Sequence, residues 1–209
     1  MRSLKTLLGL SAAVALVLTF VLSGVASATT LCKTNTTPCT SLLSTGTVLK
    51  SNLAAASKST FDPPFGTIEC SKSPLSGTTT TNGGFVPVTA NTETLSFTEC
   101  NATVTVLKKG TLSINHNSGG MSGSVVQSGS EVTVQYLGTH CIYGTNNTTI
   151  GTLIPSTSLG GGFYHNAELR VGAYIPRTGG TSGAFCGSFA YWEATYLFTA
   201  PVPLYVSNI

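Results

Sequence analysis

Residues 94–116 read Thr-Leu-Ser-Phe-Thr-Glu-Cys-Asn-Ala-Thr-Val-Thr-Val-Leu-Lys-Lys-Gly-Thr-Leu-Ser-Ile-Asn-His, and apolar and polar side chains alternate in three runs, at 94–99, 103–107 and 110–116. Successive side chains of a β-strand point to opposite faces, so each run predicts a strand with one buried face. The runs are separated by only a few residues. The stretch therefore predicts consecutive antiparallel strands joined by short turns.

The same alternation continues through the rest of the chain. Further runs lie at 131–137, 167–174 and 191–198, and weaker ones at 47–53, 67–70, 122–126, 151–154 and 204–206. Gly, Pro, Asn and Ser gather between them, and we expect loops at 73–84, 144–149 and 177–183. About ten short strands predict an all-β fold: a disulfide-stabilised antiparallel β-sandwich, Ig-like or jelly-roll-like, or a flattened barrel.

The N-terminus has the composition of an export signal. Arg2 and Lys5 precede an apolar run at 7–25, and Ala26-Ser27-Ala28 provides a small-residue cleavage site. The run is almost long enough for an uncleaved membrane anchor, but an anchor does not need the small-residue triplet. We therefore expect a signal peptide at 1–28, a single β domain at 29–209, a secreted, extracellular product and no membrane attachment after cleavage.

Charge is scarce. Charged residues make up 8% of the chain, against about a quarter in typical globular proteins. After residue 28, eight Lys and Arg stand against seven Asp and Glu, which leaves a net charge of +1. The longest basic cluster is Lys108-Lys109, so counterion release offers little affinity for nucleic acid. A surface wetted by Thr, Ser and Asn also offers little like-charge repulsion against self-association.

An even number of cysteines in an exported chain predicts disulfides rather than free thiols. The six are Cys32, Cys39, Cys70, Cys100, Cys141 and Cys186. Fifteen pairings are possible; the most local is Cys32–Cys39, and Cys70–Cys100 with Cys141–Cys186 avoids crossed links. No C-x-x-C motif occurs, and His116, His140 and His165 are scattered, so we expect neither a metal site nor a cofactor.

No catalytic set stands out. The segments Gly120-Met121-Ser122-Gly123 and Gly180-Thr181-Ser182-Gly183 differ from a nucleophile elbow, and Asp62 is the only aspartate. Glu168 and Glu193 form the best carboxylate pair for glycoside hydrolysis. Glu168, however, shares a strand face with Arg170, a pattern typical of a solvated ion pair. We therefore predict no catalytic residue and no enzyme.

Aromatic residues are densest near the C-terminus. They are Phe185, Phe189, Tyr191, Trp192, Tyr196 and Phe198. Exposed aromatic rings on a strand can stack on sugars, and the candidates for such binding are Tyr191 and Trp192. Trp192 alternates in phase with Tyr196 and Phe198, which favours a place in the core. Tyr191 is thus the better exposed candidate.

Several cysteine-framed segments resemble a group of uncharacterised exported proteins of high-GC Gram-positive, actinobacterial bacteria. They are Leu31-Cys32-Lys33 with Pro38-Cys39, Gly66-Thr67-Ile68-Glu69-Cys70-Ser71-Lys72-Ser73, Leu95-Ser96-Phe97-Thr98-Glu99-Cys100, and Tyr191-Trp192-Glu193-Ala194-Thr195-Tyr196 with Pro203-Leu204. The resemblance implies a sandwich fold and no known activity.

Three functions remain open. The composition favours a secreted non-enzymatic structural or interaction protein of the cell surface or extracellular matrix, which associates with itself through open sheet edges. The alternative is a carbohydrate- or cell-wall-binding module that holds cell-surface polysaccharide. A secreted hydrolase is the third.

Overall fold

The computed structural model describes residues 28–84, 86–156, 166–180 and 185–208. In these residues the chain forms fourteen antiparallel strands and no helix, which confirms the all-β prediction. None of the described residues forms a helix that is long and apolar enough to cross a membrane. Residues 1–27 of the expected signal peptide lie outside the described residues.

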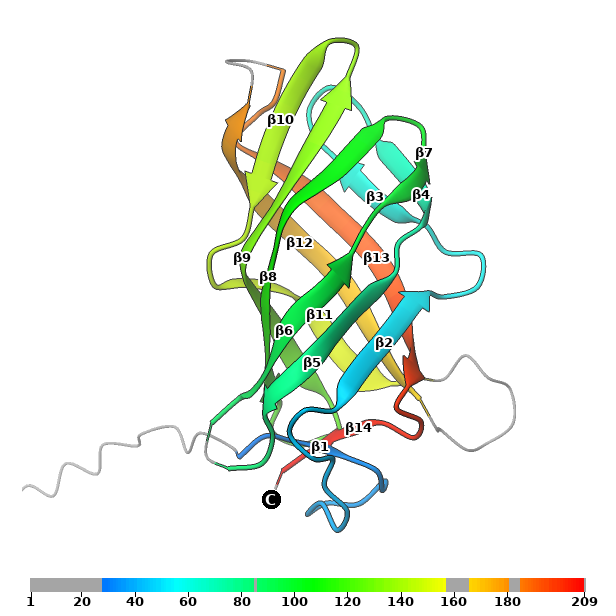
Figure 1. The fold of residues 1–209 in the computed structure, drawn as a ribbon, viewed down its shortest axis with the longest axis vertical. Helices are drawn as coiled ribbons and strands as arrows, with labels where there is room; N and C mark the ends of the chain where they lie inside the picture. The colour runs from blue at the N-terminus through cyan, green and yellow to red at the C-terminus, as the bar shows by residue number, and fades with distance from the viewer. Residues whose placement is uncertain (1–27, 85, 157–165, 181–184, 209) are drawn as a thin grey trace, which may run out of the picture.

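The strands are distributed along the whole described chain (Figure 1). In the first half they are β1 (Thr30–Cys32), β2 (Val48–Leu53), β3 (Ser59–Asp62), β4 (Ile68–Lys72), β5 (Leu75–Thr81), β6 (Val88–Leu95) and β7 (Thr98–Cys100). In the second half they are β8 (Thr103–His116), β9 (Gly123–Tyr136), β10 (Thr139–Gly144), β11 (Thr148–Pro155), β12 (Ala167–Gly180), β13 (Phe189–Ala200) and β14 (Tyr205–Ser207).

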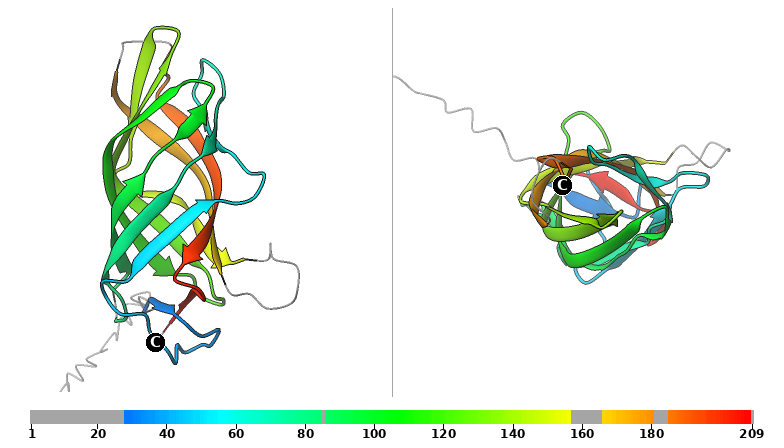
Figure 2. Two further views of the ribbon diagram at one scale, coloured as in Figure 1. Left: turned by 45° about the vertical axis from the view of Figure 1, so that its right-hand side comes forward. Right: turned by 90° about the horizontal axis from the view of Figure 1, so that it is seen from above.

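Eight strands close into a ring around the lower half of the molecule. The order β2-β5-β6-β8-β9-β11-β12-β13 returns to β2 through the β13–β2 pairing. The end-on view shows the strands surrounding a common interior (Figure 2). Of the two architectures left open by the sequence, the barrel therefore describes this part of the chain. We call it the lower ring.

A second ring lies above the first and uses the continuations of four long strands. The upper ring runs β8-β9-β10-β12-β13-β3-β4-β7. It is open at one place, because in the described residues β7 does not pair with β8. Two of the shared strands, β8 and β9, each have a glycine with positive φ where the rings meet, Gly110 and Gly129. Gly110 in β8 has a φ of 69°, and a Cβ there would lie 2.3 Å from the Ser128 carbonyl oxygen, so only glycine fits this bend.

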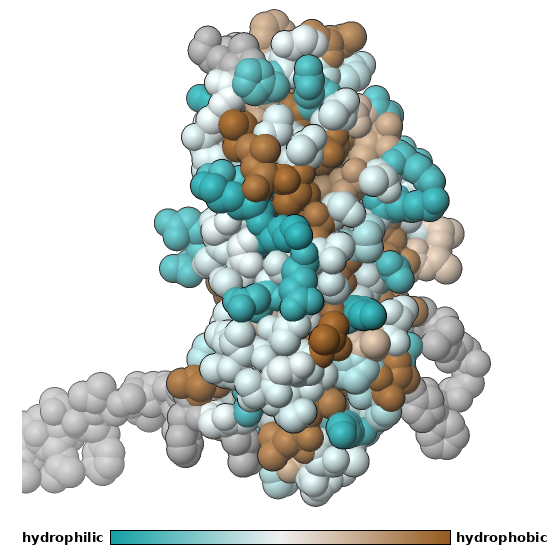
Figure 3. All heavy atoms as spheres, in the orientation of Figure 1, coloured by the Kyte–Doolittle hydropathy of each residue, from teal (hydrophilic) through white to brown (hydrophobic). Residues whose placement is uncertain are grey.

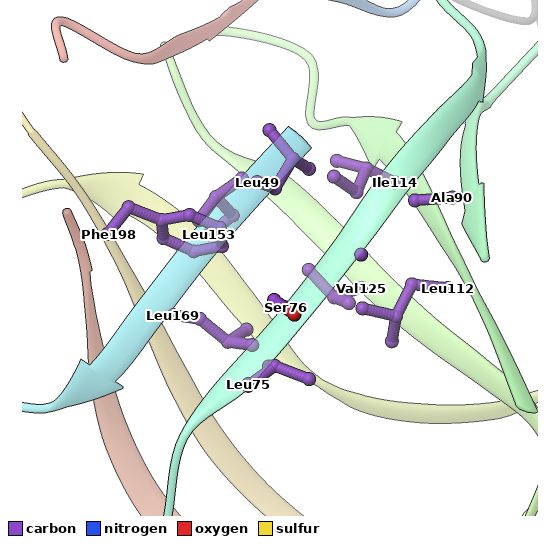
Figure 4. A pocket seen from close by; sticks show the side chains of 11 residues that line it. Leu49, Leu75, Ser76, Ala90, Leu112, Ile114, Val125, Leu153, Leu169 and Phe198 are labelled. Carbon is purple, nitrogen blue, oxygen red and sulfur yellow. The ribbon is translucent and has the colours of Figure 1, made fainter. Parts of the chain in front are cut away.

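The interior of the lower ring is apolar and filled. Side chains from its strands meet there, including Leu49, Leu112, Val125, Leu169 and Phe198 (Figure 4). The cavity left between them has a volume of ≈ 20 Å³. That is about the space of one water molecule, and the lining is almost wholly apolar. The lower interior is a packed core rather than a ligand pocket.

The interior of the upper ring is built from aromatic rings. Trp192 stacks on Phe61 with ring centroids 5.9 Å apart and meets Phe97 edge-on at 6.0 Å. Its indole N–H donates to the Ser59 hydroxyl at 3.0 Å, which satisfies the one polar atom of this ring. Tyr143 donates its hydroxyl to the Cys186 carbonyl at 2.6 Å. Aromatic packing with paired polar tips therefore forms the upper core.

Burial raises the pKa values of two tyrosines of this core. Desolvation raises the pKa of Tyr143 to about 12, while the charge of Arg177 acts in the opposite direction. Desolvation also raises the pKa of Tyr196 well above its usual range, opposed by hydrogen bonds from Ser73 and Ser59. Both phenols are therefore kept neutral inside the barrel.

A two-stranded sheet, β1 with β14, closes the lower end (Figure 1). The side chain of Asn82 connects it to the barrel. The Leu31 amide donates to the Asn82 carbonyl oxygen at 2.7 Å, and the Asn82 amide donates to the carbonyls of Leu31 and Leu43. The apolar side chains of Leu31, Leu204 and Val206 are buried beneath it.

The strand boundaries correct several predictions. The runs 103–107 and 110–116 form one strand, β8, because Gly110 bends the backbone without ending it. The runs 122–126 and 131–137 likewise join in β9, through Gly129. The expected loop 73–84 contains β5, whose threonines extend along the barrel wall instead of forming a turn. Thr and Gly in that segment hid the alternation.

All three predicted disulfides are present. Cys32–Cys39 closes a short loop next to β1, Cys70–Cys100 joins β4 to β7, and Cys141–Cys186 lies in the interior of the upper ring. Three disulfides are typical of proteins that fold in an oxidising environment.

Candidate binding face

The candidate site lies on the outer face of the four-stranded wall β12-β13-β3-β4. Inward side chains of β13 are buried at Ala190, Trp192 and Ala194, so Tyr191 and Glu193 between them point outward. Strand register then brings residues of different strands into rows. Tyr191 is paired with Tyr174 of β12 on one side and with Asp62 of β3 on the other.

Three aromatic rings from β12 and β13 form the first part of the site, which we call the aromatic row. They are Tyr174, Phe189 and Tyr191. The Tyr174 and Phe189 ring centroids are 4.9 Å apart and edge-on, and those of Tyr174 and Tyr191 are 5.0 Å apart and tilted by 54°. Tyr174 is 63% exposed and Phe189 50% exposed, so this apolar surface faces water.

Gly172 makes room for the aromatic row. It lies next to Tyr174 on the outer face of β12, and a Cβ there would come within 2.9 Å of the Tyr191 hydroxyl oxygen. The Tyr191 side chain thus extends over Gly172. A larger residue at this position would displace the ring.

A polar hollow borders the aromatic row. Glu193 is paired with Thr60, and Thr60 is paired with Glu69, which places two carboxylates on either side of one threonine. Lys58 forms an ion pair with Glu69 at 2.5 Å. The hollow has a volume of ≈ 280 Å³. Its lining residues are Ser57, Lys58, Thr60, Glu69, Glu193, Ala194 and Thr195.

The two predicted binding residues are on opposite sides of the wall. Tyr191 lies outside, in the aromatic row. Trp192 is 3% exposed and belongs to the core, so it is not available to a ligand. The sequence prediction missed Tyr174, although its position in the 167–174 run has the outward phase. It did not reveal that β12 and β13 are paired, which is what brings Tyr174 to Tyr191.

Glu168 and Glu193 do not form a facing pair. Glu168 pairs with Leu197, four residues along β13 from Glu193, a separation of about 13 Å. Glycosidases need both carboxyl groups at one cleft, whereas the Glu168 side chain is buried and Glu193 is exposed. The expected solvated face is also wrong for Glu168. Its side chain is buried and ion-paired at 2.6 Å to Arg170, which is itself exposed.

The other residues considered for chemistry are separate. The Ser122 hydroxyl accepts a hydrogen bond from Asn117, and the His116 ring lies 2.6 Å from the Gly120 carbonyl oxygen, as in a hydrogen-bonded turn. Ser182 and His165 lie outside the described residues. Among the described residues, no group of three or more His, Cys, Asp or Glu side chains is placed to hold a metal ion.

Comparison of the chain with protein-family models, with curated proteins and with solved structures finds no match.

Proposed function

We propose that the chain is a secreted, non-enzymatic interaction protein of the cell surface or extracellular matrix, and that its outer wall binds polysaccharide. The observation that carries this proposal is the aromatic row beside the polar hollow, on one continuous wall of four strands. Both parts are held by paired strands, so a ligand would meet a preorganised surface.

The chemistry of this surface suits a sugar. The apolar C–H face of a pyranose packs against aromatic rings, and exposed Tyr174 and Phe189 gain by being removed from water. Sugar hydroxyls need charged or hydroxyl partners, which Glu193, Thr60 and Lys58 offer within the adjoining hollow. A contiguous apolar surface rimmed by polar groups is also a common mark of an interaction site.

A retention experiment tests the proposal. Oxidised protein of residues 29–209 is incubated with insoluble chitin, cellulose, xylan and bacterial peptidoglycan, and the bound fraction is measured. We expect retention by at least one of them, and a loss of about tenfold in affinity for Tyr191→Ala, the equivalent of one lost ring contact of about 1.4 kcal/mol. Tyr136→Ala is the matched control, because Tyr136 is a partly exposed aromatic residue outside the face.

Two results would contradict polysaccharide binding. One is retention by none of the four polymers. The other is retention that is equal for the parent protein, Tyr191→Ala and Tyr136→Ala. Far-ultraviolet circular dichroism of each variant shows whether the barrel is intact, so a folding defect is recognised as such.

Self-association is a second candidate, and one separate feature favours it. Within the part of the chain that the structure describes, residues 103–109 of β8 pair with β9 alone, so their other edge is open toward β7. Leu107 on this segment is 50% exposed, and apolar side chains gather beside the upper part of β8 (Figure 3). Unpaired edges favour strand pairing between copies. Light scattering during size-exclusion chromatography should show oligomers that Leu107→Lys dissociates; a monomer at every concentration would exclude this.

A further inference from the structure

We infer that the face binds a segment of a linear, neutral or amine-bearing polysaccharide, several sugar units long, laid along β13 across two subsites. The inference rests on the proposed function and specifies its ligand. The first subsite is the aromatic row, and the second is the polar hollow.

The length of the face sets the length of the ligand. Phe189, Tyr191, Glu193 and Thr195 all project outward from β13. Residues two apart on a strand are separated by about 6.7 Å, so these four cover about 20 Å. A single pyranose ring is much shorter than this. A ligand that uses both subsites is therefore an oligosaccharide segment rather than a monosaccharide.

The two subsites differ in what they offer. The three rings of the aromatic row meet at angles of 54° and 80°, so they present separate ring faces and edges instead of one flat plate. Such a surface contacts the apolar sides of sugar units. The hollow supplies the Lys58 ammonium, the Thr60 hydroxyl and the Glu193 carboxylate, which together donate and accept hydrogen bonds. Glu193 has no ion-pair partner among the described residues, so its carboxylate is available.

Charge on the face selects against acidic polymers. Among the described residues of β3, β4, β13 and the turn before β3 on this face, the carboxylates of Asp62, Glu69 and Glu193 are accompanied by the Lys58 ammonium, which already engages Glu69. Arg170, one row away on β12, is engaged by Glu168. A polyuronate would bring its carboxylates next to those of the face, whereas hydroxyl, amide or ammonium groups would pair with them. The ligand is therefore neutral or amine-bearing.

Isothermal titration calorimetry with glycan fragments of one to six sugars tests the inference. The fragments are released from whichever of the four polymers retains the protein. Affinity should rise at least tenfold between one and four sugars and then level off, when both subsites are filled. Polygalacturonate should bind at least tenfold more weakly than the neutral hexamer at low ionic strength.

Two variants separate the subsites. Thr60→Val removes a hydroxyl from the hollow and keeps the β-branched shape, and Glu193→Gln removes the charge and keeps the size. Each variant should lower the affinity for the four-sugar fragment about fivefold. The affinity for the two-sugar fragment, which binds at the aromatic row, should change by less than twofold. Tyr191→Ala should lower the affinities for both fragments by similar factors.

The outcomes distinguish the inference from the proposed function. If no polymer retains the protein, both fail. If a polymer retains it but a monosaccharide binds as tightly as the hexamer, or polygalacturonate binds as tightly as the neutral chain, the two-subsite inference is overturned and polysaccharide binding stands. Equal effects of Thr60→Val on the two-sugar and four-sugar fragments would also overturn it.

Discussion

Tyr191 and Trp192 are neighbours in the chain and lie on opposite sides of the barrel wall. Trp192 packs between Phe61 and Phe97, with its N–H satisfied by Ser59. Tyr191 lies outside against Tyr174 and is half-buried. The inward ring therefore contributes its buried area to folding, whereas part of the outward ring stays exposed, where the proposed function places the ligand. Two aromatic side chains that follow each other in the chain thus differ in burial according to the face of the strand on which each lies.

The sharpest test of this division compares truncations on the two faces. Trp192→Ala should lower the free energy of unfolding by about 3–5 kcal/mol, because it empties a packed site, and Tyr191→Ala by less than about 1 kcal/mol. Urea titration with the disulfides intact measures both. If Trp192→Ala does not fold, Trp192→Phe serves instead and should still cost more than Tyr191→Ala. Equal losses would break the comparison.

The disulfides offer a second comparison, between a long closed loop and a short one. Cys141 and Cys186 are buried and 45 residues apart, while Cys32–Cys39 closes only 7 residues. Replacing both cysteines of the long loop by alanine should cost about 3–4 kcal/mol, against about 2 kcal/mol for the short one, because a longer loop restricts the unfolded chain more. Chemical denaturation of the two double variants checks this, and the reverse order would contradict it.

Two glycines with positive φ differ in their surroundings: Gly110 lies at the bend in the wall, and Gly138 lies in an exposed turn. Gly110 and Gly138 both have positive φ, but a Cβ at Gly110 meets the Ser128 carbonyl at 2.3 Å and one at Gly138 meets nothing within 4 Å. Gly110→Ala should cost about 2–3 kcal/mol and Gly138→Ala about 1 kcal/mol. Thermal and urea unfolding measure the difference. Identical costs would mean that the wall relaxes around the added methyl group.

The smallest expected effect concerns the buried phenol of Tyr143. Burial raises its pKa from the usual 10.0 to about 12, so its contribution to stability is complete below pH 10 and decreases as the pH rises through 10 toward 12. The parent protein should therefore lose about 1 kcal/mol more than Tyr143→Phe between pH 8 and pH 11. Urea titrations at the two pH values measure this. An equal loss would show that Tyr143 ionises alike in the folded and unfolded chains.

The candidate site was predictable only in part. Tyr191 follows from alternation, because it is out of phase with Trp192, Tyr196 and Phe198. Its partners do not follow from alternation. Tyr174 and Asp62 lie 17 and 129 positions earlier in the chain, and only the strand register brings them next to Tyr191. The polar hollow likewise combines β3, β4 and β13. A site assembled across strands has no local sequence signal.

By itself the sequence determined the all-β class and most strand positions, because alternation is a local property of the chain. It also favoured one of fifteen cysteine pairings, and the structure has that pairing. Only the tertiary structure decided that β13 pairs with β2 and closes the lower ring, that Gly110 continues a strand, and that Glu168 is buried. These depend on which strands become neighbours, and that is decided by the packing of the whole barrel.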